Sequence, residues 1–381
     1  MEDVQEQDPF RAERQKSGVL VADFSGEAIP MILGYRAVRE AAKAWQTYSS
    51  DAPFRVPIPS EEGVRSVRQL PIEADPPLHT AFRDLIKPFF AAPQHPDYQG
   101  RIQALTTEMI AQAKAMDRLE IVRDFALPLQ SRALTYLLGV PEEEALTWMG
   151  WGTHVFHDGD DSHAKGSGLE AYIRGRLDRA RKDGGDDFFA FLSQAVVNGA
   201  PLTAEEQLGI ANLVFAGGRD TVITSIARML AYFADHRAEL AEIAEDEKRI
   251  ALAVEEFMRV ISPLTHIGRV CRHATRLGDH PLPADSRISL CWASANADES
   301  VFDRPETVQL NRQVNPHVAF GSGVHSCLGA PQARTILRSL IRALATETRG
   351  IEILSETRQY EVYGTARRWV GYTALDVRIL A

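Results

Sequence analysis

The chain has 381 residues, of which 45% are hydrophobic and 25% are charged, and its formal net charge is −10. This is the composition of an ordinary globular protein, and an acidic balance without a dense basic cluster argues against a nucleic-acid partner. No apolar run approaches the roughly 20 residues that span a bilayer, and the acidic first ten residues are unlike a signal peptide.

The three cysteines are Cys271, Cys291 and Cys327. Their odd number and the absence of metal-type spacing argue against a disulfide framework and favour a reducing compartment. No linker-like, low-complexity or repeated stretch divides the sequence. We therefore expect one domain over residues 1–381, located in the cytoplasm.

The N-terminal part of the sequence predicts strands at 19–24 and 30–33 and then a helix over 35–45. A proline-spaced stretch at 51–71 predicts a loop. Residues 100–195 have the periodicity of several amphipathic helices.

A helix is predicted to start at Asp75-Pro-Pro77, because proline is tolerated in the first turn. His79 and Arg83 are four residues apart on it and therefore share a face. Two hydrogen-bond donors on one face suit an anionic group, although a solvated helix surface has the same pattern.

The capping box Thr203-Ala-Glu-Glu206 opens a long predicted helix that extends to about residue 236. Two adjacent glycines, Gly217 and Gly218, lie in its middle and cost on the order of 2 kcal/mol relative to alanine. Close helix packing or an opening in the hydrogen-bond ladder can offset that cost. The acid–alcohol pair Asp220-Thr221, which follows directly, favours an opening.

Glu256 and Arg259 lie on another helical segment, where their spacing puts them on one face among apolar neighbours. This arrangement predicts a buried, hydrogen-bonded ion pair. Residues 287–292 alternate like a strand, and the chain after residue 351 is rich in strand-forming residues.

The stretch Phe320–Gly329 contains three glycines and Cys327, and an apolar-periodic helix follows it. The start of a helix offers unpaired backbone N–H groups and a partial positive charge. Both stabilise a thiolate and lower the pKa of a cysteine. A thiolate held in this way can ligate iron or zinc, or can act as a nucleophile.

The pattern F-G-x-G-x-H-x-C-x-G around Cys327 resembles the haem-binding loop of the cytochrome P450 superfamily, the haem-thiolate monooxygenases. Residues 75–83, 217–221 and 256–259 match three further motifs of this family, in its order. The chain resembles soluble bacterial members, and its layout is closest to the camphor-hydroxylating type. The resemblance implies a mainly α fold with a small β region, in which a triangular helical prism surrounds the haem and a long central helix binds oxygen.

The resemblance also implies roles for individual residues. Cys327 would be the axial ligand of the iron of haem b, and its thiolate would favour O–O cleavage. Asp220 and Thr221 would relay protons to bound dioxygen, the co-substrate. The residues implied as a structural lock on the haem side are Glu256, Arg259 and Arg312.

Two haem propionates would be held by His79, Arg83 and Arg269. The remaining positions that the family's pattern places at the haem and at the oxygen groove are His325, Phe320, Gly321, Gly329, Gly217 and Gly218.

The substrate pocket is less defined by the sequence. The positions that the camphor-type layout brings near it are Val67, Leu70, Ile72, Leu213, Thr265, His266, Arg368 and Trp369. Several of these are polar, and a hydrocarbon substrate would leave polar groups buried without partners. We therefore expect a small polar substrate, for example a methoxylated sugar or aromatic acid that undergoes oxidative demethylation. The alternative is hydroxylation of a terpene-like hydrocarbon.

The chain has no flavin or iron–sulfur segment, so a monomeric enzyme would take electrons from a separate ferredoxin and its reductase. Lys87, Arg334 and Arg338 are candidates for the docking surface. Two other classes are a non-catalytic haem-thiolate sensor or carrier and a peroxide-driven peroxygenase. The Asp220-Thr221 pair argues against both, because a sensor needs no proton relay and peroxygenase members of the family usually lack such an acid–alcohol pair.

Overall fold

Helices are the main elements of the computed structural model, which describes residues 8–152, 162–364 and 366–381. The helices are α2 (Arg11–Lys16), α3 (Tyr35–Lys43), α4 (Leu78–Ile86), α5 (Pro96–Ala113), α6 (Leu127–Leu138), α7 (Glu144–Gly150), α8 (Ser162–Asp183), α9 (Phe188–Gln194), α10 (Ala204–Gly218), α11 (Asp220–Asp235), α12 (Arg237–Ala244), α13 (Glu247–Ile261), α14 (Trp292–Asn296) and α15 (Ala330–Glu347). Three short helical turns are η1 (Phe89–Gln94), η2 (Ile121–Ala126) and η3 (Gly323–His325).

The β structure is smaller and forms separate sheets. The strands are β1 (Val19–Phe24), β2 (Glu27–Ile32), β3 (Tyr48–Ser49), β4 (Leu119–Glu120), β5 (Val196–Val197), β6 (Ala200–Pro201), β7 (His266–Cys271), β8 (Thr275–Leu277), β9 (His280–Leu282), β10 (Arg287–Cys291), β11 (Gly350–Tyr363) and β12 (Ala366–Leu380). The largest sheet has the order β1-β2-β10-β7-β3, and a second sheet has the order β11-β12-β4. The predicted class, mainly α with a small β region, is confirmed.

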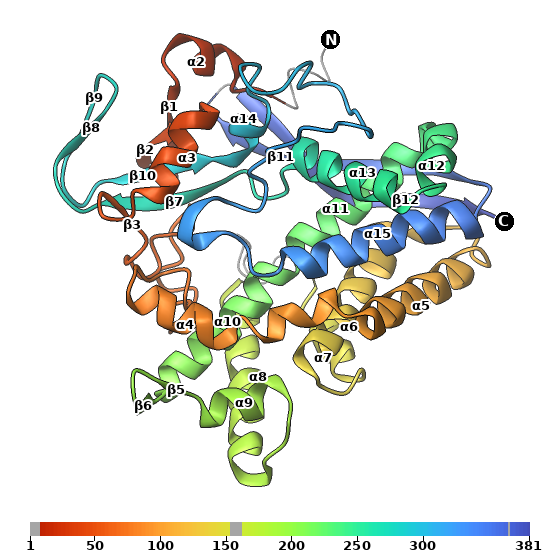
Figure 1. Ribbon diagram of the computed structural model, residues 1–381, viewed down its shortest axis with the longest axis horizontal. Coiled ribbons are helices and arrows are strands. Elements are labelled where there is room, and N and C mark those ends of the chain that lie inside the picture. The colour runs from red at the N-terminus through yellow and green to blue at the C-terminus, as the bar shows by residue number, and fades with distance from the viewer. Residues whose placement is uncertain (1–7, 153–161, 365) are drawn as a thin grey trace.

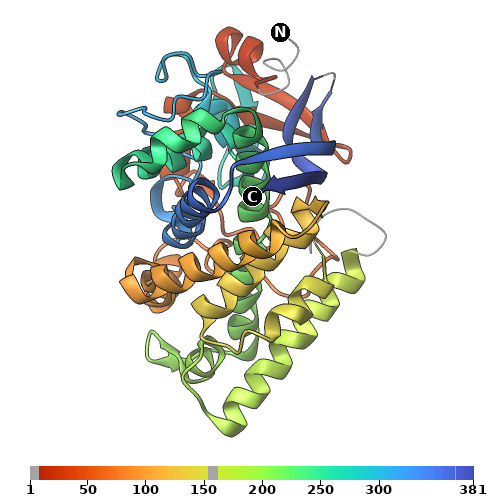
Figure 2. The same cartoon turned by 90° about the vertical axis from the view of Figure 1, so that its right-hand side faces the viewer.

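Helices α10 and α11 form a long central rod that crosses the molecule (Figure 1). α11 contacts α6, α12, α13 and α15 as well as the hairpin of β11 and β12, and α10 contacts α8 and α9. α8 and α9 lie beside α10, α12 follows the far end of α11, and the five-stranded sheet lies to one side of the rod (Figures 1 and 2). The rod is therefore covered on most sides, so its polar groups must find partners inside the protein.

The sequence located the elements around this rod well. The capping box is present, since the Thr203 side chain accepts from the Glu206 N–H and the Glu206 carboxylate accepts from the Thr203 N–H. β1 has the predicted bounds, and α3 ends two residues earlier than predicted. Residues 51–71 contain no helix or named strand, as expected for the proline-spaced loop.

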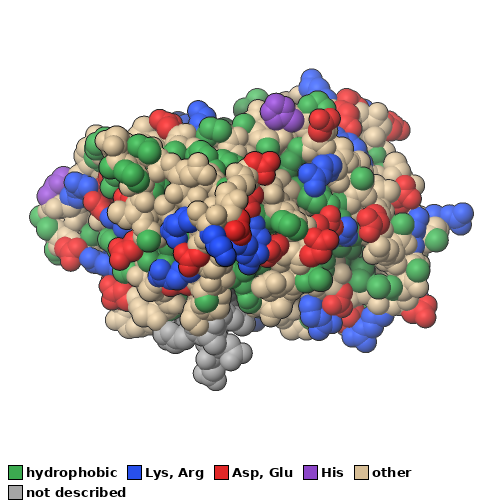
Figure 3. Space-filling model, turned by 90° about the horizontal axis from the view of Figure 1, so that it is seen from below, with side chains coloured by type: hydrophobic (Ala, Val, Ile, Leu, Met, Phe, Trp, Pro, Cys, Tyr) green, Lys and Arg blue, Asp and Glu red, His purple; other side chains and the backbone are tan. Residues whose placement is uncertain are grey.

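Acidic and basic side chains are intermixed on the face seen from below (Figure 3). This face therefore has no extended region of one sign. Among the described residues, no helix is both long and apolar enough to cross a membrane.

Candidate active site

The loop before α15 presents Cys327 by means of tight turns. Gly321 and Gly323 both have φ of 75°, a left-handed conformation that glycine adopts without strain. A Cβ atom on Gly323 would lie 2.7 Å from the carbonyl oxygen of Ala42 in α3, so only glycine fits there. The Cys327 N–H donates to the Phe320 carbonyl at 2.8 Å and closes the loop. The sulfur is thereby fixed just before the first turn of α15.

The groups around the Cys327 sulfur shift the pKa of its thiol in opposite directions. The side chain is solvent-accessible although it lies well inside the molecule, and burial raises the pKa of its thiol above the ordinary value. Backbone N–H groups of Gly329 and Ala330 act in the other direction, as do the guanidinium groups of Arg83 and Arg334. A metal cation at the sulfur would supply the additional stabilisation that a thiolate needs here.

Four cationic or hydrogen-bond-donating side chains gather beside this loop. The His79 and His325 rings lie 4.3 Å apart between centroids, and Arg83 Nη2 reaches Ser326 Oγ at 3.4 Å. Arg269 is only 2% exposed, and its Nη1 donates to the carbonyl oxygen of Gly268 at 2.7 Å. Burial lowers the pKa of Arg269 to about 10. Asp75 is the carboxylate whose charge acts on Arg269, but it is bonded to Arg272 at 2.7 Å, and no carboxylate of the described residues is hydrogen-bonded to this cluster.

The pKa of both histidines of this cluster is lowered, which favours their neutral form. Burial, and then Arg83, lowers the pKa of His79 to about 4. Burial, and then Arg269, His79 and Arg83, lowers the pKa of His325 to about 2. His79 Nδ1 and His325 Nε2 are buried atoms without a hydrogen-bond partner. Unpartnered buried donors next to buried guanidinium groups suit carboxylates of a bound ligand.

The central rod is interrupted where the sequence predicted an opening. α10 ends at Gly218 and α11 begins at Asp220, and Arg219 between them has φ −104° and ψ −74°. Cβ atoms built on Gly217 and Gly218 would meet no other atom within 4 Å, so close packing is not the reason for these glycines. Asp220 and Thr221 form the first turn of α11, directly after the interruption.

The haem of the cytochrome P450 family fits this arrangement. An iron porphyrin with two propionates requires three features that this site has. They are one cysteine with two backbone N–H groups, two glycines that leave open space on the rod, and donor side chains to which no carboxylate of the described residues is hydrogen-bonded. The residues that would hold it are Cys327, His79, Arg83, Arg269 and His325.

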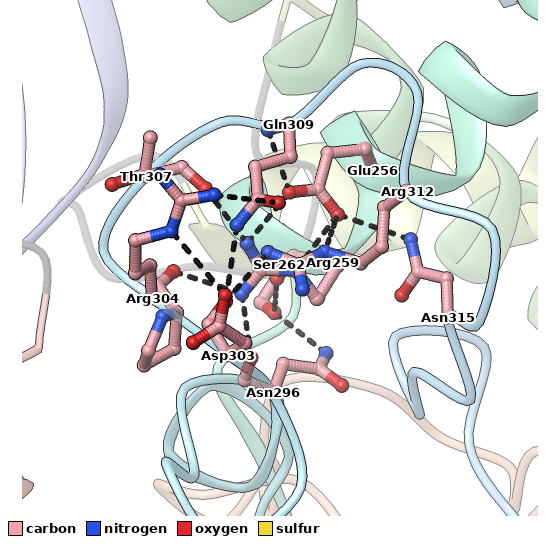
Figure 4. A network of polar contacts seen from close by, with 11 residues as sticks. Glu256, Arg259, Ser262, Asn296, Asp303, Arg304, Thr307, Gln309, Arg312 and Asn315 are labelled. Atoms are coloured by element: carbon pink, nitrogen blue, oxygen red, sulfur yellow. Dashed lines mark hydrogen bonds and ion pairs between the residues drawn. The ribbon is translucent and has the colours of Figure 1, made fainter.

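Glu256 is the centre of a buried polar network (Figure 4). Its carboxylate accepts from Arg259 Nε and Nη2 at 2.9 and 2.8 Å and from Arg312 Nε at 2.9 Å. The Gln309 N–H and Asn315 Nδ2 also donate to it. Burial opposes ionisation, but these donors hold the pKa of Glu256 below its ordinary value. The structure therefore brings the three predicted lock residues into one bonded group.

Glu256→Gln is expected to lower the free energy of unfolding by about 3–5 kcal/mol, because it leaves Arg259 and Arg312 buried without a counter-charge. Urea unfolding measures the loss. Glu352→Gln is the matched control, since Glu352 pairs with Arg378 at 3.1 Å with half of its side chain exposed. Its loss should be below about 1 kcal/mol, and equal losses for the two variants would refute a structural role for Glu256.

The neighbouring Glu255 was not predicted from the sequence. Its two oxygens accept from Arg334 Nε and Nη2 at 2.6 and 2.7 Å, and one of them also lies 3.0 Å from His317 Nε2. Burial acts against ionisation, but Arg334 and His317 lower the pKa of Glu255 to about 2. α13 is thus tied both to α15 and to the segment that leads into the Cys327 loop.

The bond between Glu255 and Arg334 bears on the three residues predicted to form the ferredoxin docking surface. Arg334 is engaged by Glu255, and Arg338 is only partly exposed with its Nε buried and unpartnered. Lys87 is exposed at the C-terminal end of α4. Of the three, only Lys87 is an ordinary surface cation, and a docking role for any of them stays a prediction.

The polar residues predicted near the substrate mostly have partners within the protein. Arg368 is 2% exposed and donates to Thr265 Oγ1 at 2.7 Å and to the Ile261 carbonyl at 2.6 Å. Trp369 donates through Nε1 to the Gly371 carbonyl at 2.8 Å. The expectation that a hydrocarbon would leave these groups unpartnered is therefore wrong for Arg368, Thr265 and Trp369.

The other pocket candidates are placed differently. His266 retains a buried, unpartnered Nδ1. Val67 and Leu70 are buried, whereas Ile72 and Leu213 are partly exposed. A cavity of about 730 Å³ lies elsewhere, between α2, α13 and α14, and among the predicted residues only Arg259 and Arg368 line it.

Comparison with known proteins supports the family. The family model described as Cytochrome P450 matches residues 169–344. Erythromycin C-12 hydroxylase of Saccharopolyspora erythraea is 31% identical, with 76% of this chain and 74% of that protein covered. Linalool 8-monooxygenase of Pseudomonas putida is 26% identical, with 76% of this chain and 73% of that protein covered.

Among solved structures, one described as the structure of a carbohydrate active P450 superposes with a TM-score of 0.95 and is 41% identical, covering 98% of both chains. Agreement over nearly the full length confirms the fold expected from the motifs. The geometry around Cys327 and the relatives lead to one conclusion: the chain belongs to the cytochrome P450 family of haem-thiolate monooxygenases.

Proposed function

We propose that this monooxygenase acts on a carbohydrate and removes a methyl group from it by oxidation. The observation that carries the proposal is the likeness to the carbohydrate active P450, at 41% identity over 98% of both chains. The polar residues predicted near the pocket support a polar substrate less than the sequence suggested, because Arg368 and Thr265 are hydrogen-bonded to each other and need no partner from the substrate.

Cys327 is the residue that would hold the iron of haem b through its sulfur. His79, Arg83, Arg269 and His325 would hold the propionates, and their excess of donors over acceptors supports that assignment. When bound, haem supplies the iron at which dioxygen is activated. The protein's own part is to keep the sulfur ionised and the carboxylates partnered.

Proton delivery is the role that we assign to Asp220 and Thr221. Two protons are needed for each dioxygen that is cleaved. A carboxyl group and a neighbouring hydroxyl group can transfer protons from solvent inward through ordered water. The interruption before Asp220 supports this role, because it frees the first turn of α11 from a regular helical ladder. We further propose that a ferredoxin and its reductase supply the electrons to a monomeric, cytoplasmic enzyme.

The proposed reaction balances as an oxidative O-demethylation. One dioxygen, two electrons from ferredoxin and two protons convert the methoxyl carbon to a hydroxymethyl ether and release water. The hydroxymethyl ether is a hemiacetal, so its bond to the sugar oxygen breaks. Formaldehyde leaves, and the sugar keeps a free hydroxyl group.

Spectral titration of the ferric holoenzyme tests the substrate class. A monosaccharide methyl ether should shift the main absorption band to shorter wavelength, and turnover should give formaldehyde and free sugar in equal amounts. The same sugar without its methyl group is the control and should give no formaldehyde. A shift with a monoterpene alcohol but with no methylated sugar would reject the proposal in favour of terpene hydroxylation, for which the likeness to linalool 8-monooxygenase is the supporting observation.

A further inference from the structure

The carbonyl of Gly218 does not take part in the helical ladder of the central rod. In a regular α-helix it would accept from the N–H of Val222, four residues later. Val222 N instead donates to the Arg219 carbonyl at 3.1 Å. The Gly218 oxygen accepts from Gln130 Nε2 at 2.7 Å. A side chain from another helix has therefore replaced the backbone donor.

The side chain of Gln130 on α6 is fixed by its burial. Its side chain is only 1% exposed, and α6 packs directly against α11. A buried carbonyl without a donor is unfavourable, so the Gln130 amide removes the main penalty for an interrupted ladder. Its Oε1 atom is buried and has no partner, which leaves one acceptor for an ordered water at the interruption.

The opposite side of the interruption is also fixed. Arg219 is 1% exposed, and its Nη2 donates to the carbonyl oxygens of Trp148 at 3.0 Å and Gly152 at 2.6 Å. The residue between α10 and α11 is thus tied to the end of α7, while the residue before it is tied to α6. The interruption is held from two sides by side-chain bonds.

We propose that Gln130 is a positioning residue for oxygen activation. By holding the Gly218 carbonyl it keeps the rod open and orients Asp220 and Thr221, which begin α11 immediately afterwards. This inference rests on the proposed proton-delivery role of those two residues. Gln130 itself acts through them and through the helix, and it donates no proton in the reaction.

Gln130→Leu keeps the side-chain size and removes the donor. We expect the ratio of product to dioxygen consumed to fall at least about threefold, with hydrogen peroxide rising, because the acid and alcohol groups lose their alignment. The KM for the substrate should change little. A crystal structure of the variant should show Val222 N bonded again to the Gly218 carbonyl. Tyr98→Phe is the matched control, because Tyr98 donates to the Ala133 carbonyl of the same α6 helix at 3.1 Å and not to the Gly218 carbonyl.

Gln130→Glu gives a readout that a merely structural role would not give. A protonated carboxyl group can donate to the Gly218 carbonyl, whereas an ionised one cannot. Coupling relative to the parent enzyme should therefore be retained at low pH and lost as the pH rises. This variant also carries the test if Gln130→Leu fails to fold.

Two outcomes separate this inference from the function on which it rests. The role of Gln130 alone would be overturned if Gln130→Leu kept both the interrupted rod and the parental ratio of product to dioxygen while Thr221→Ala lost that ratio. Parental coupling in Thr221→Ala would instead overturn the proton-delivery role.

Discussion

Cys327→Ala is expected to yield a protein that no longer shows the strongly red-shifted carbon monoxide band of thiolate-ligated haem. The sulfur sits beside the backbone N–H groups of Gly329 and Ala330, and the other two cysteines, Cys271 in β7 and Cys291 in β10, are buried. Alanine removes the only group in the loop that can place an anionic sulfur on iron. Monooxygenase activity should fall to background, and the absorption spectrum of the reduced, carbon monoxide-treated variant checks the result.

The control for this variant is Cys291→Ala. Cys291 is 0% exposed in β10, and burial raises the pKa of its thiol to about 12, so it is a packing residue. Its loss should leave the band unchanged. A red-shifted band that survives in Cys327→Ala and disappears in Cys291→Ala would contradict the assignment of the ligand.

Thr221→Ala is expected to separate oxygen consumption from product formation. The hydroxyl group that would pass protons is lost, while the haem and the substrate pocket are not changed directly. We expect product per dioxygen to fall at least about tenfold, with peroxide released instead, since a positioned proton donor contributes about 10²–10⁴ in rate. Oxygen-electrode and product measurements on the same sample check this ratio.

Thr221→Ser is the matched variant because it keeps the hydroxyl group and removes only a methyl group. It should restore most of the coupling. The proton-delivery role would be refuted if the alanine and serine variants formed the same amount of product per dioxygen, whether both kept the parental value or both lost it.

The parts of the site that depend on residues close in sequence could be predicted. The loop 320–329, the capping box at Thr203 and the interruption after Gly218 each lie within a short stretch whose glycines and caps have one physical explanation. The pair Glu256 and Arg259 follows from helical spacing. The length of α10 and α11 was predicted too, because apolar periodicity extends over both.

The bonds that fix this site across the fold could not be predicted from spacing. Gln130 bonds to a residue 88 positions away, and Glu255 bonds to Arg334 across 79 positions. A buried glutamine or a partly buried glutamate in an amphipathic helix carries no local pattern that reveals its partner. The same limit explains why Arg368 and Thr265 were expected to lack partners in the pocket. They are 103 positions apart in the sequence and are hydrogen-bonded to each other in the structure.

The carbon monoxide spectrum of the reduced wild-type protein tests the central claim most directly. A strongly red-shifted main band would be the result that thiolate ligation by Cys327 predicts. Protein supplied with haem that binds none, or that shows only the short-wavelength band of a neutral ligand in the freshly prepared, folded state, would contradict the haem-thiolate site and with it the proposed reaction.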